Sequence, residues 1–186
     1  MRRPDDPTQG VVQIGSRLRG LQVPSVDVRI YRHWFWRRAY KWVCAQFDLN
    51  GDGTFSTYEL LNGPRVVIYG HSLGGWAVLE LSRKLNSKGI PVSLTVQIDS
   101  VGIGDEEVPS NVRDAANFYQ RTARLLRGES RIKPKDSRAT TVIGNFLIEH
   151  VDHEGVARRP EVSRFIIDRV LSLCAPKGNE EVINTQ

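Results

Sequence analysis

A serine bracketed by glycines, directly after a run of β-branched residues, constrains this chain more than any other feature. Residues 65–69 read RVVIY, and residues 70–75 read GHSLGG. Val and Ile favour strands, whereas the residues after the glycines have helical spacing. Gly70 and Gly74 leave room where side chains would collide across a tight turn. The segment predicts a strand, a sharp turn and a helix, with the Ser72 hydroxyl presented as a nucleophile.

The GHSLGG sequence behind a Val/Ile strand resembles the nucleophile elbow of the α/β-hydrolases, in particular lipases, esterases and thioesterases. The likeness extends from about Asp27 to Leu173. It implies a three-layer α/β fold, in which a mostly parallel sheet is flanked by helices. It also implies the chain order Ser, Asp, His and the hydrolysis of a carboxylic ester or thioester, with a small acyl-ester or lipid as substrate.

The acid of this order is expected at the end of the next strand. Residues 92–98 read VSLTVQI and predict that strand, and Asp99 follows at its carboxyl end, where α/β sheets place their chemistry. Asp99 is therefore the expected acid. A turn cap is the alternative for Asp99, and Asp105 and Asp136 are then the substitutes.

The base is expected after a third strand, predicted over residues 140–148. His150 and His153 both follow this strand, and a terminal helix is expected from about Pro160. The family resemblance favours His153, because an aliphatic residue, Val156, follows it three residues later. His150 is interpreted as a solvated loop histidine. By the same resemblance, the N–H of Leu73 is expected to bind the oxyanion, together with a second N–H from a loop after an earlier strand.

That earlier strand is the point at which the chain departs from the family. The first ten residues are polar and broken by proline, and residues 10–21 have the spacing of a helix. Residues 27–31 are predicted as the edge strand. Residues 11–14 could form a short strand, but too few residues separate them from Asp27 for an ordinary crossover helix. We therefore expect an amino-terminal truncation or a misplaced start. A missing inner strand would remove one oxyanion donor, worth about 3 kcal/mol in the transition state.

A second motif, at residues 48–59, reads DLNGDGTFSTYE and fits the calcium loop of an EF-hand. A large hard cation needs about six to eight oxygen ligands, and the glycine at the sixth position permits the turn that gathers them. Helices are expected over residues 34–47 before the loop and 58–62 after it. A glycine-rich connection that binds no metal is the alternative. The expected ligands are Asp48, Asn50, Asp52, Thr54, Ser56 and Glu59.

Composition adds few constraints. The 186 residues, 40% hydrophobic and 25% charged, predict one domain over residues 1–186. The net charge of +5 is small and spread along the chain, so nucleic-acid binding is not favoured. Two cysteines are too few for a disulfide framework, and no apolar run is long enough to span a membrane. The sequence shows no signal peptide, so the compartment stays open.

Residues 105–139 are predicted to form an insertion between acid and base, with a helix over residues 111–126. Their position suits a lid or acyl pocket, and a plain surface connection is equally compatible. The function predicted overall is that of a serine esterase or lipase-like hydrolase with a structural calcium ion. A non-catalytic calcium-binding protein on a truncated hydrolase scaffold is the alternative.

Overall fold

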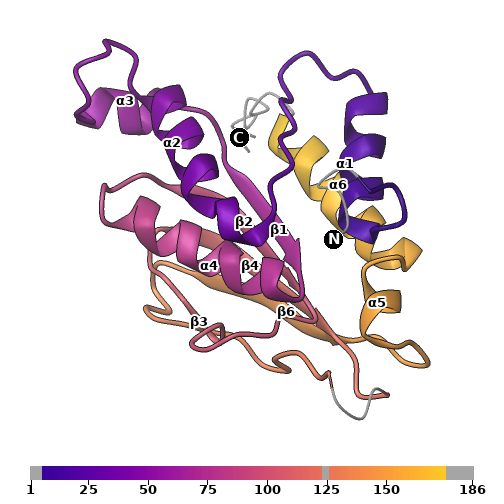
Figure 1. The fold of residues 1–186 in the computed structure, drawn as a ribbon. Coiled ribbons are helices and arrows are strands. Elements are labelled where there is room, and N and C mark those ends of the chain that lie inside the picture. The colour runs from indigo at the N-terminus through magenta and orange to yellow at the C-terminus, as the bar shows by residue number, and fades with distance from the viewer. Residues whose placement is uncertain (1–5, 123–125, 175–186) are drawn as a thin grey trace, which may run out of the picture.

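The computed structural model describes residues 6–122 and 126–174, which form an α/β structure around a parallel sheet (Figure 1). Within these residues the main sheet has the strand order β1-β2-β4-β6, and every neighbouring pair is parallel. A smaller sheet pairs β3 with β5. The strands are β1 (Val67–His71), β2 (Val92–Ile98), β3 (Glu107–Val108), β4 (Val112–Tyr119), β5 (Lys133–Pro134) and β6 (Thr141–Leu147).

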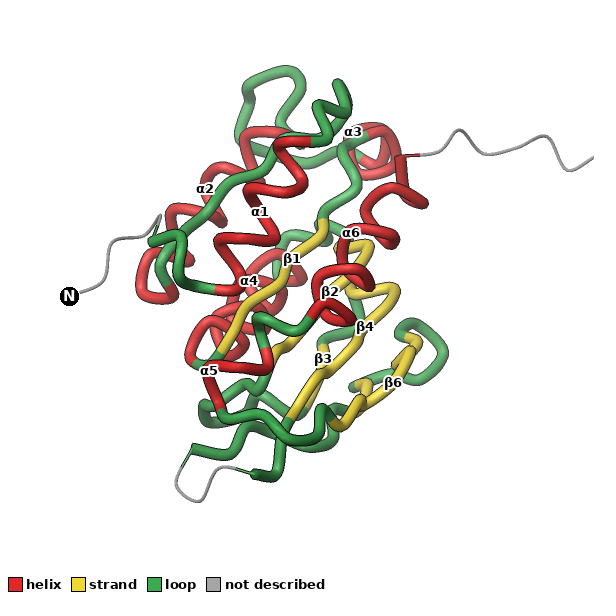
Figure 2. The backbone as a smooth tube through the Cα atoms, turned by 90° about the vertical axis from the view of Figure 1, so that its right-hand side faces the viewer, coloured by secondary structure: helices red, strands yellow, loops and turns green. Residues whose placement is uncertain are grey.

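Helices cover both faces of the main sheet, which gives three layers (Figures 1 and 2). One face carries α2 (Trp36–Phe47) and α4 (Leu73–Asn86), and the other carries α1 (Gly10–Gly20) and α6 (Pro160–Cys174). The shorter elements are the 3₁₀ helix η1 (His33–Phe35), α3 (Thr57–Asn62) and α5 (His153–Val156). The predicted α/β class with a parallel sheet between helices is confirmed.

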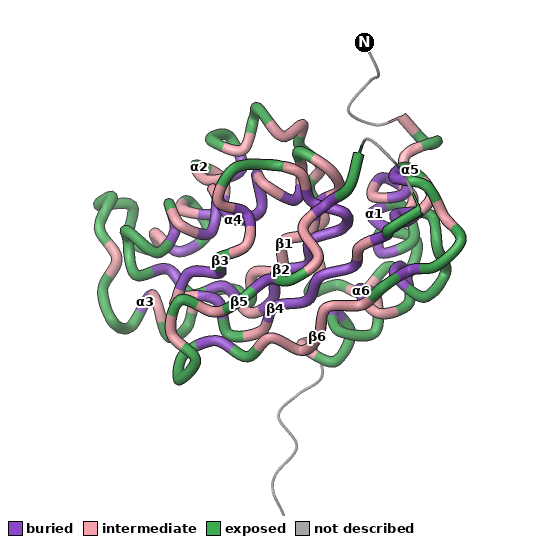
Figure 3. Tube along the Cα trace, turned by 90° about the horizontal axis from the view of Figure 1, so that it is seen from below, coloured by how far each residue is buried: buried purple, intermediate pink, exposed green. Residues whose placement is uncertain are grey.

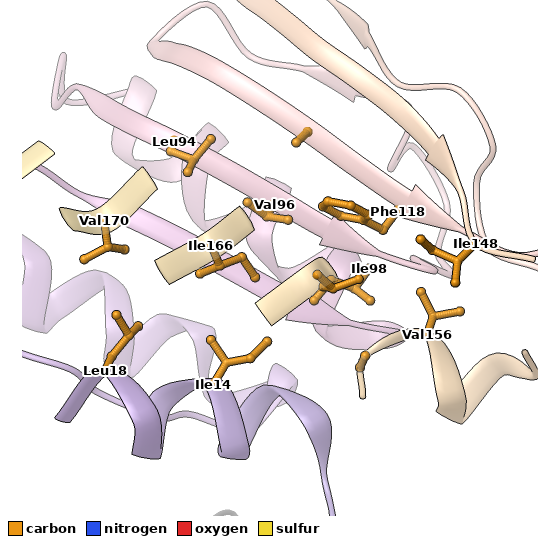
Figure 4. Close-up of a cluster of buried hydrophobic side chains, with 13 residues drawn as sticks. Ile14, Leu18, Leu94, Val96, Ile98, Phe118, Ile148, Val156, Ile166 and Val170 are labelled. Atoms are coloured by element: carbon orange, nitrogen blue, oxygen red, sulfur yellow. The ribbon is translucent and has the colours of Figure 1, made fainter. Parts of the chain in front are cut away.

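Two apolar cores hold these layers together. In the first, Ile14 of α1 and Ile166 of α6 pack against Val96 and Ile98 of β2 (Figure 4). In the second, Val43 of α2 packs with residues of α4 on the opposite face of the sheet. Figure 3 shows that β2 and β4 are buried along most of their length. Each fully buried Ile, Val or Leu contributes about 1.5–3 kcal/mol, so the central strands anchor the site at their ends.

Most predicted elements agree with the structure. The strand predicted over residues 92–98 is β2, and the helix predicted from Pro160 is α6. The helices expected around the 48–59 loop are α2 with η1 before it and α3 after it. These segments have strong local patterns, so their type does not depend on distant contacts.

Two predicted elements are wrong. Residues 27–31 are extended but pair with no other strand among the described residues, so they are not an edge strand. Residues 112–119, predicted as part of a helix, form β4 in the middle of the sheet. Their apolar residues are spaced by three and four positions, which is also the spacing of a helix. A strand that is buried on both faces needs no alternation of apolar and polar residues, so this spacing did not distinguish the two. The 105–139 segment therefore supplies a central strand and is not an inserted lid as a whole.

The sheet is open at β1. Among the described residues, β1 pairs only with β2, and no strand lies on its other side. Within the described residues, β1 is thus an edge strand of the main sheet. In the part of the chain that the structure describes, no helix is long and apolar enough to cross a membrane.

Candidate active site

Ser72 occupies the turn between β1 and α4. Its backbone has φ 59° and ψ −128°, a left-handed conformation that costs energy in a residue other than glycine. Gly70 permits this turn, because a Cβ there would lie 2.3 Å from the carbonyl oxygen of Gly74. Gly75 permits the packing of α4, because a Cβ there would lie 2.5 Å from Ser100. The prediction that Gly74 itself avoids a collision is wrong, since a Cβ at Gly74 meets nothing within 4 Å.

The structure brings the three predicted catalytic side chains into one chain of hydrogen bonds. The Ser72 Oγ lies 2.8 Å from His153 Nε2, and His153 Nδ1 lies 2.7 Å from Asp99 Oδ2. Asp99 is fully buried and His153 is nearly so, with 7% of its surface exposed. With a proton on Nδ1 donated to Asp99, the Nε2 of a neutral imidazole is free to accept the serine proton.

Both carboxylate oxygens of Asp99 have further donors. The Oδ1 atom accepts from the backbone N–H of Gly128 at 3.0 Å and of Gln120 at 3.3 Å. The Oδ2 atom accepts from the Gln120 side-chain amide at 2.9 Å in addition to His153. Only glycine at position 128 lets its backbone N–H come this close to Asp99, because a Cβ there would lie 2.3 Å from the Asp99 backbone. These contacts hold a buried carboxylate that would otherwise be costly to desolvate.

His153 is positioned by α5, the short helix after β6. The Asp152 side chain caps α5 by accepting from Gly155 N at 2.7 Å. Val156, which the sequence analysis used to choose the base, is fully buried in the core. Burial of Val156 fixes the rotation of this turn, so His153 points inward. His150 is exposed, in agreement with its interpretation as a loop histidine.

The two substitute acids lie in other contacts. Asp105 accepts a hydrogen bond of 2.5 Å from the Ser100 hydroxyl, and its burial raises its pKa. Asp136 accepts from the backbone and guanidinium of Arg138, and these hydrogen bonds lower its pKa. Of the three aspartates considered, Asp99 is the one whose carboxylate bonds to His153.

Leu73, the expected oxyanion donor, is the first residue of α4. Its N–H lies in the first turn, where helix N–H groups have no intrahelical acceptor. The positive end of the helix dipole adds to the attraction for a negative charge at this point. This position suits one of the two predicted oxyanion donors. The strand expected to carry the second donor is not among the described residues.

His71 is a site residue that sequence reasoning missed. Its Nε2 lies 2.7 Å from the backbone carbonyl of His153, and the two imidazole rings are 4.6 Å apart. Burial lowers the pKa of His71, so the neutral ring with a proton on Nε2 donates this hydrogen bond. His71 therefore ties His153 to β1. Its place directly before Ser72 was the signal that could have identified it.

Gln120 was missed for a different reason. It follows β4, and because that strand was predicted as a helix, its carboxyl end could not be placed beside the ends of β1 and β2. Once β4 is recognised, parallel pairing of Ile98 with Phe118 places Gln120 next to Asp99.

The predicted calcium loop keeps several internal hydrogen bonds. Asp48 Oδ2 accepts from Gly53 N at 3.1 Å, and Asp52 Oδ1 accepts from Thr54 N at 2.7 Å. Glu59 accepts from the backbone of Ser56 and Leu49, and the hydrogen bond from Ser56 is the main cause of its lowered pKa. Each of these three carboxylates therefore accepts at least one backbone N–H of the loop.

The loop has one feature of a cation site and lacks another. The Oδ1 atom of Asp48 is buried and has no hydrogen-bond partner in the described part of the chain, as a cation ligand would. Over residues 6–122 and 126–174, however, no three side chains of His, Cys, Asp or Glu lie close enough together to hold a metal. The six predicted ligands therefore stay a prediction.

Comparisons with known proteins identify no relative. No family model matches the chain, and no curated protein or solved structure matches it significantly.

We predict that Gly70→Ala and Gly74→Ala have opposite effects on stability. The new Cβ at Gly70 collides with backbone, so unfolding free energy should fall by about 1–3 kcal/mol. The Cβ at Gly74 enters open space within a helix, so stability should rise by up to about 1 kcal/mol. Urea denaturation measures both. Equal losses in the two variants would contradict the turn geometry.

A second prediction concerns pH. Because burial lowers the pKa of His71 below its ordinary value of 6.5, protons bind the unfolded chain more readily than the folded one. The stability present above pH 6.5 should therefore be lost as the pH falls. His71→Gln keeps a donor but cannot be protonated, so its unfolding free energy should fall less between pH 6.5 and about 5. Parallel pH profiles for the two proteins would show that His71 does not titrate this way.

Proposed function

We propose that the protein is a serine hydrolase that cleaves a carboxylic ester or thioester. The observation that carries the proposal is the hydrogen-bond chain from Ser72 Oγ through His153 to the buried carboxylate of Asp99. The serine stands at a strained turn before a helix, where a nucleophile is accessible and a developing negative charge meets helix N–H groups. The resemblance of GHSLGG to the α/β-hydrolase elbow agrees with this proposal.

In the first step, Ser72 Oγ attacks the acyl carbonyl while His153 Nε2 takes the hydroxyl proton. Asp99 keeps the imidazole oriented and stabilises its charged form. The N–H of Leu73 donates to the oxyanion. The carbon–oxygen or carbon–sulfur bond of the substrate then breaks, and His153 returns the proton to the leaving alcohol or thiol.

The second step reverses these roles with water. His153 takes a proton from water, which attacks the acyl–Ser72 ester, and then returns that proton to Ser72 Oγ as the free acid leaves. His71 supports both steps because it holds the backbone carbonyl of His153.

One observation favours the alternative of a non-catalytic protein. No strand lies beside the free edge of β1 among the described residues, so the second oxyanion donor has no assigned source. A site with one donor would react more slowly, because removal of one oxyanion donor costs about 100- to 1,000-fold in turnover. Turnover of a short-chain nitrophenyl ester distinguishes the two functions, whereas a covalent probe reports whether Ser72 is activated at all.

We predict that a fluorophosphonate adds once, at Ser72. Intact-protein mass spectrometry should show a single adduct in the wild type and none in Ser72→Ala. His153→Ala should lower the labelling rate by several orders of magnitude, because triad members act as a unit. The matched control His150→Ala should label at close to the wild-type rate, since that side chain is exposed. Labelling of a different serine, or equal loss in both histidine variants, would defeat the assignment.

We further propose that the 48–59 loop binds Ca²⁺ and that the ion is structural. Asp48, Asn50, Asp52, Ser56 and Glu59 would supply side-chain oxygens and Thr54 its carbonyl. The buried Asp48 oxygen without a partner supports this proposal. The loop precedes β1 in the chain but contributes no hydrogen bond to Ser72, His153 or Asp99, so catalysis needs no metal from it.

Calcium should therefore raise the melting temperature. A ligand bound only by the native state stabilises it by about 2.7 kcal/mol at about a hundredfold excess over its dissociation constant. The rise should vanish in Glu59→Gln, which loses bidentate coordination, and persist in the exposed control Tyr58→Phe. Differential scanning calorimetry with Ca²⁺ and with EGTA measures this. If EGTA removed activity without lowering the melting temperature, the ion would belong to the mechanism instead.

A further inference from the structure

Residues 28–47 combine cationic and aromatic side chains and contain no acidic residue. Three of the four tryptophans of the chain lie in this segment, which has neither Asp nor Glu. It carries five positive charges, and the net charge of the whole chain is +5. The segment by itself thus holds as much positive charge as the excess of the whole chain. Its basic residues are Arg29, Arg32, Arg37, Arg38 and Lys41.

Packing in the core accounts for only one side of this segment. Ala39, Val43 and Phe47 of α2 are buried, and they pack with residues of α4. The exposed rings lie before α2, in η1 and in the extended chain that leads to it. Neither apolar core includes them, so they do not serve to hold the layers of the fold together. Of these rings, Trp34 is 50% exposed, Phe35 40% and Tyr31 37%.

Charges and rings share one surface. The guanidinium carbon of Arg38 lies 4.6 Å from the centre of the Phe35 ring. That of Arg37 lies 4.6 Å from the centre of the Trp36 ring. A cation over an aromatic ring is attracted by the ring but keeps its full positive charge. The exposed apolar area and the positive charge are therefore presented together to any partner.

Few of these charges are neutralised within the protein. Arg29 pairs with Asp27 at 3.0 Å. In the part of the chain that the structure describes, no ion pair joins an acidic side chain to Arg32, Arg37, Arg38 or Lys41. The remaining positive potential is complementary to an anionic partner. Exposed rings beside it further require a partner with apolar as well as anionic groups.

The ring contacts favour a lipid surface over a nucleic acid. Bases bind by stacking on open faces of aromatic rings, but Arg37 and Arg38 each cover one face of a ring here. The Trp34 ring also has the His33 ring 3.9 Å away. A bilayer needs no open ring face, because Trp and Tyr lie among the headgroups while Arg and Lys reach the phosphates.

An apolar cavity next to the exposed rings also favours a lipid partner. Its volume is about 850 Å³, and Trp34 lines it together with mostly apolar side chains of β1, α2 and α4. Such a space suits hydrocarbon and not a charged polymer. Gly70 and Gly74, on either side of Ser72, line the same cavity, and η1 contacts α4. The aromatic surface and the turn at Ser72 therefore border one apolar space.

We propose that Tyr31, Arg32, Trp34, Phe35, Arg37, Arg38 and Lys41 form a docking surface for an anionic lipid bilayer. The three exposed rings enter the headgroup region, and the basic side chains bind lipid phosphates. The protein then lies on the bilayer with its cavity toward it. The proposal does not depend on hydrolase activity.

Co-sedimentation of the full chain with lipid vesicles tests this proposal. Vesicles of equal parts phosphatidylcholine and phosphatidylglycerol should bind the protein. Vesicles of phosphatidylcholine alone should bind it about tenfold or more weakly, because they lack the anionic charge. Binding to the anionic vesicles should weaken as salt is added, because salt screens the attraction.

Charge reversal at the surface should remove most of the affinity. Each cation near an anionic bilayer is worth about fivefold, so Arg37→Glu/Arg38→Glu should bind at least about thirtyfold more weakly. Both positions lie in the first turn of α2, where Glu favours the helix dipole, so the fold should persist by circular dichroism. The matched control is Lys133→Glu/Lys135→Glu, which makes the same charge change at exposed positions in and after β5. It should bind within about threefold of the wild type.

The exposed rings should contribute separately from the charges. Trp34→Ala should weaken binding by about tenfold at low and at high salt, since its contribution is apolar. Leu61→Ala, 79% exposed on α3, removes apolar surface elsewhere and should bind like the wild type.

Three results would overturn the proposal. Equal binding to both kinds of vesicle would show that the charges do not select an anionic bilayer. Equal losses in the two double variants would assign binding to net charge and not to this surface. Tighter binding of a single-stranded oligonucleotide than of vesicles, lost in Arg37→Glu/Arg38→Glu, would assign the surface to nucleic acid.

Discussion

Parallel pairing of the strands is the constraint on which the site depends. Because β1, β2, β4 and β6 run in one direction, their carboxyl ends meet at one edge of the sheet. Ser72 follows β1, Asp99 follows β2, Gln120 follows β4 and His153 follows β6. Side chains up to 81 positions apart thereby come within hydrogen-bond distance. A slip of one residue in any pairing would turn one of these groups to the other face.

Strain at two of these strand ends is balanced by close contacts around them. Ser72 and Asp99 both have positive φ, at 59° and 42°, which the chain adopts only where the surroundings require it. Gly70 and Gly128 allow backbone to approach where any side chain would collide. Gly128 in turn donates to Asp99, so the same contact that permits the geometry also stabilises the buried carboxylate. The placement of the proposed catalytic side chains and local stability therefore depend on the same contacts.

The free edge of β1 bears on both the proposed activity and the cavity beside it. Among the described residues no strand pairs with this edge, so the proposed hydrolase has no assigned second oxyanion donor there, and β1 lines a cavity of about 850 Å³.

The sequence by itself determined the elements with local patterns: the turn at Ser72, β2, α4 and α6. It also placed Asp99 and His153 at strand ends, since these residues follow clear apolar runs. It misassigned β4, whose apolar residues have a spacing that fits a helix as well as a strand buried on both faces. Only the tertiary structure decided that β4 lies between β2 and β6, that Gln120 holds Asp99 and that His71 holds His153. Those contacts join residues distant in the chain, and local spacing carries no record of which strands become neighbours.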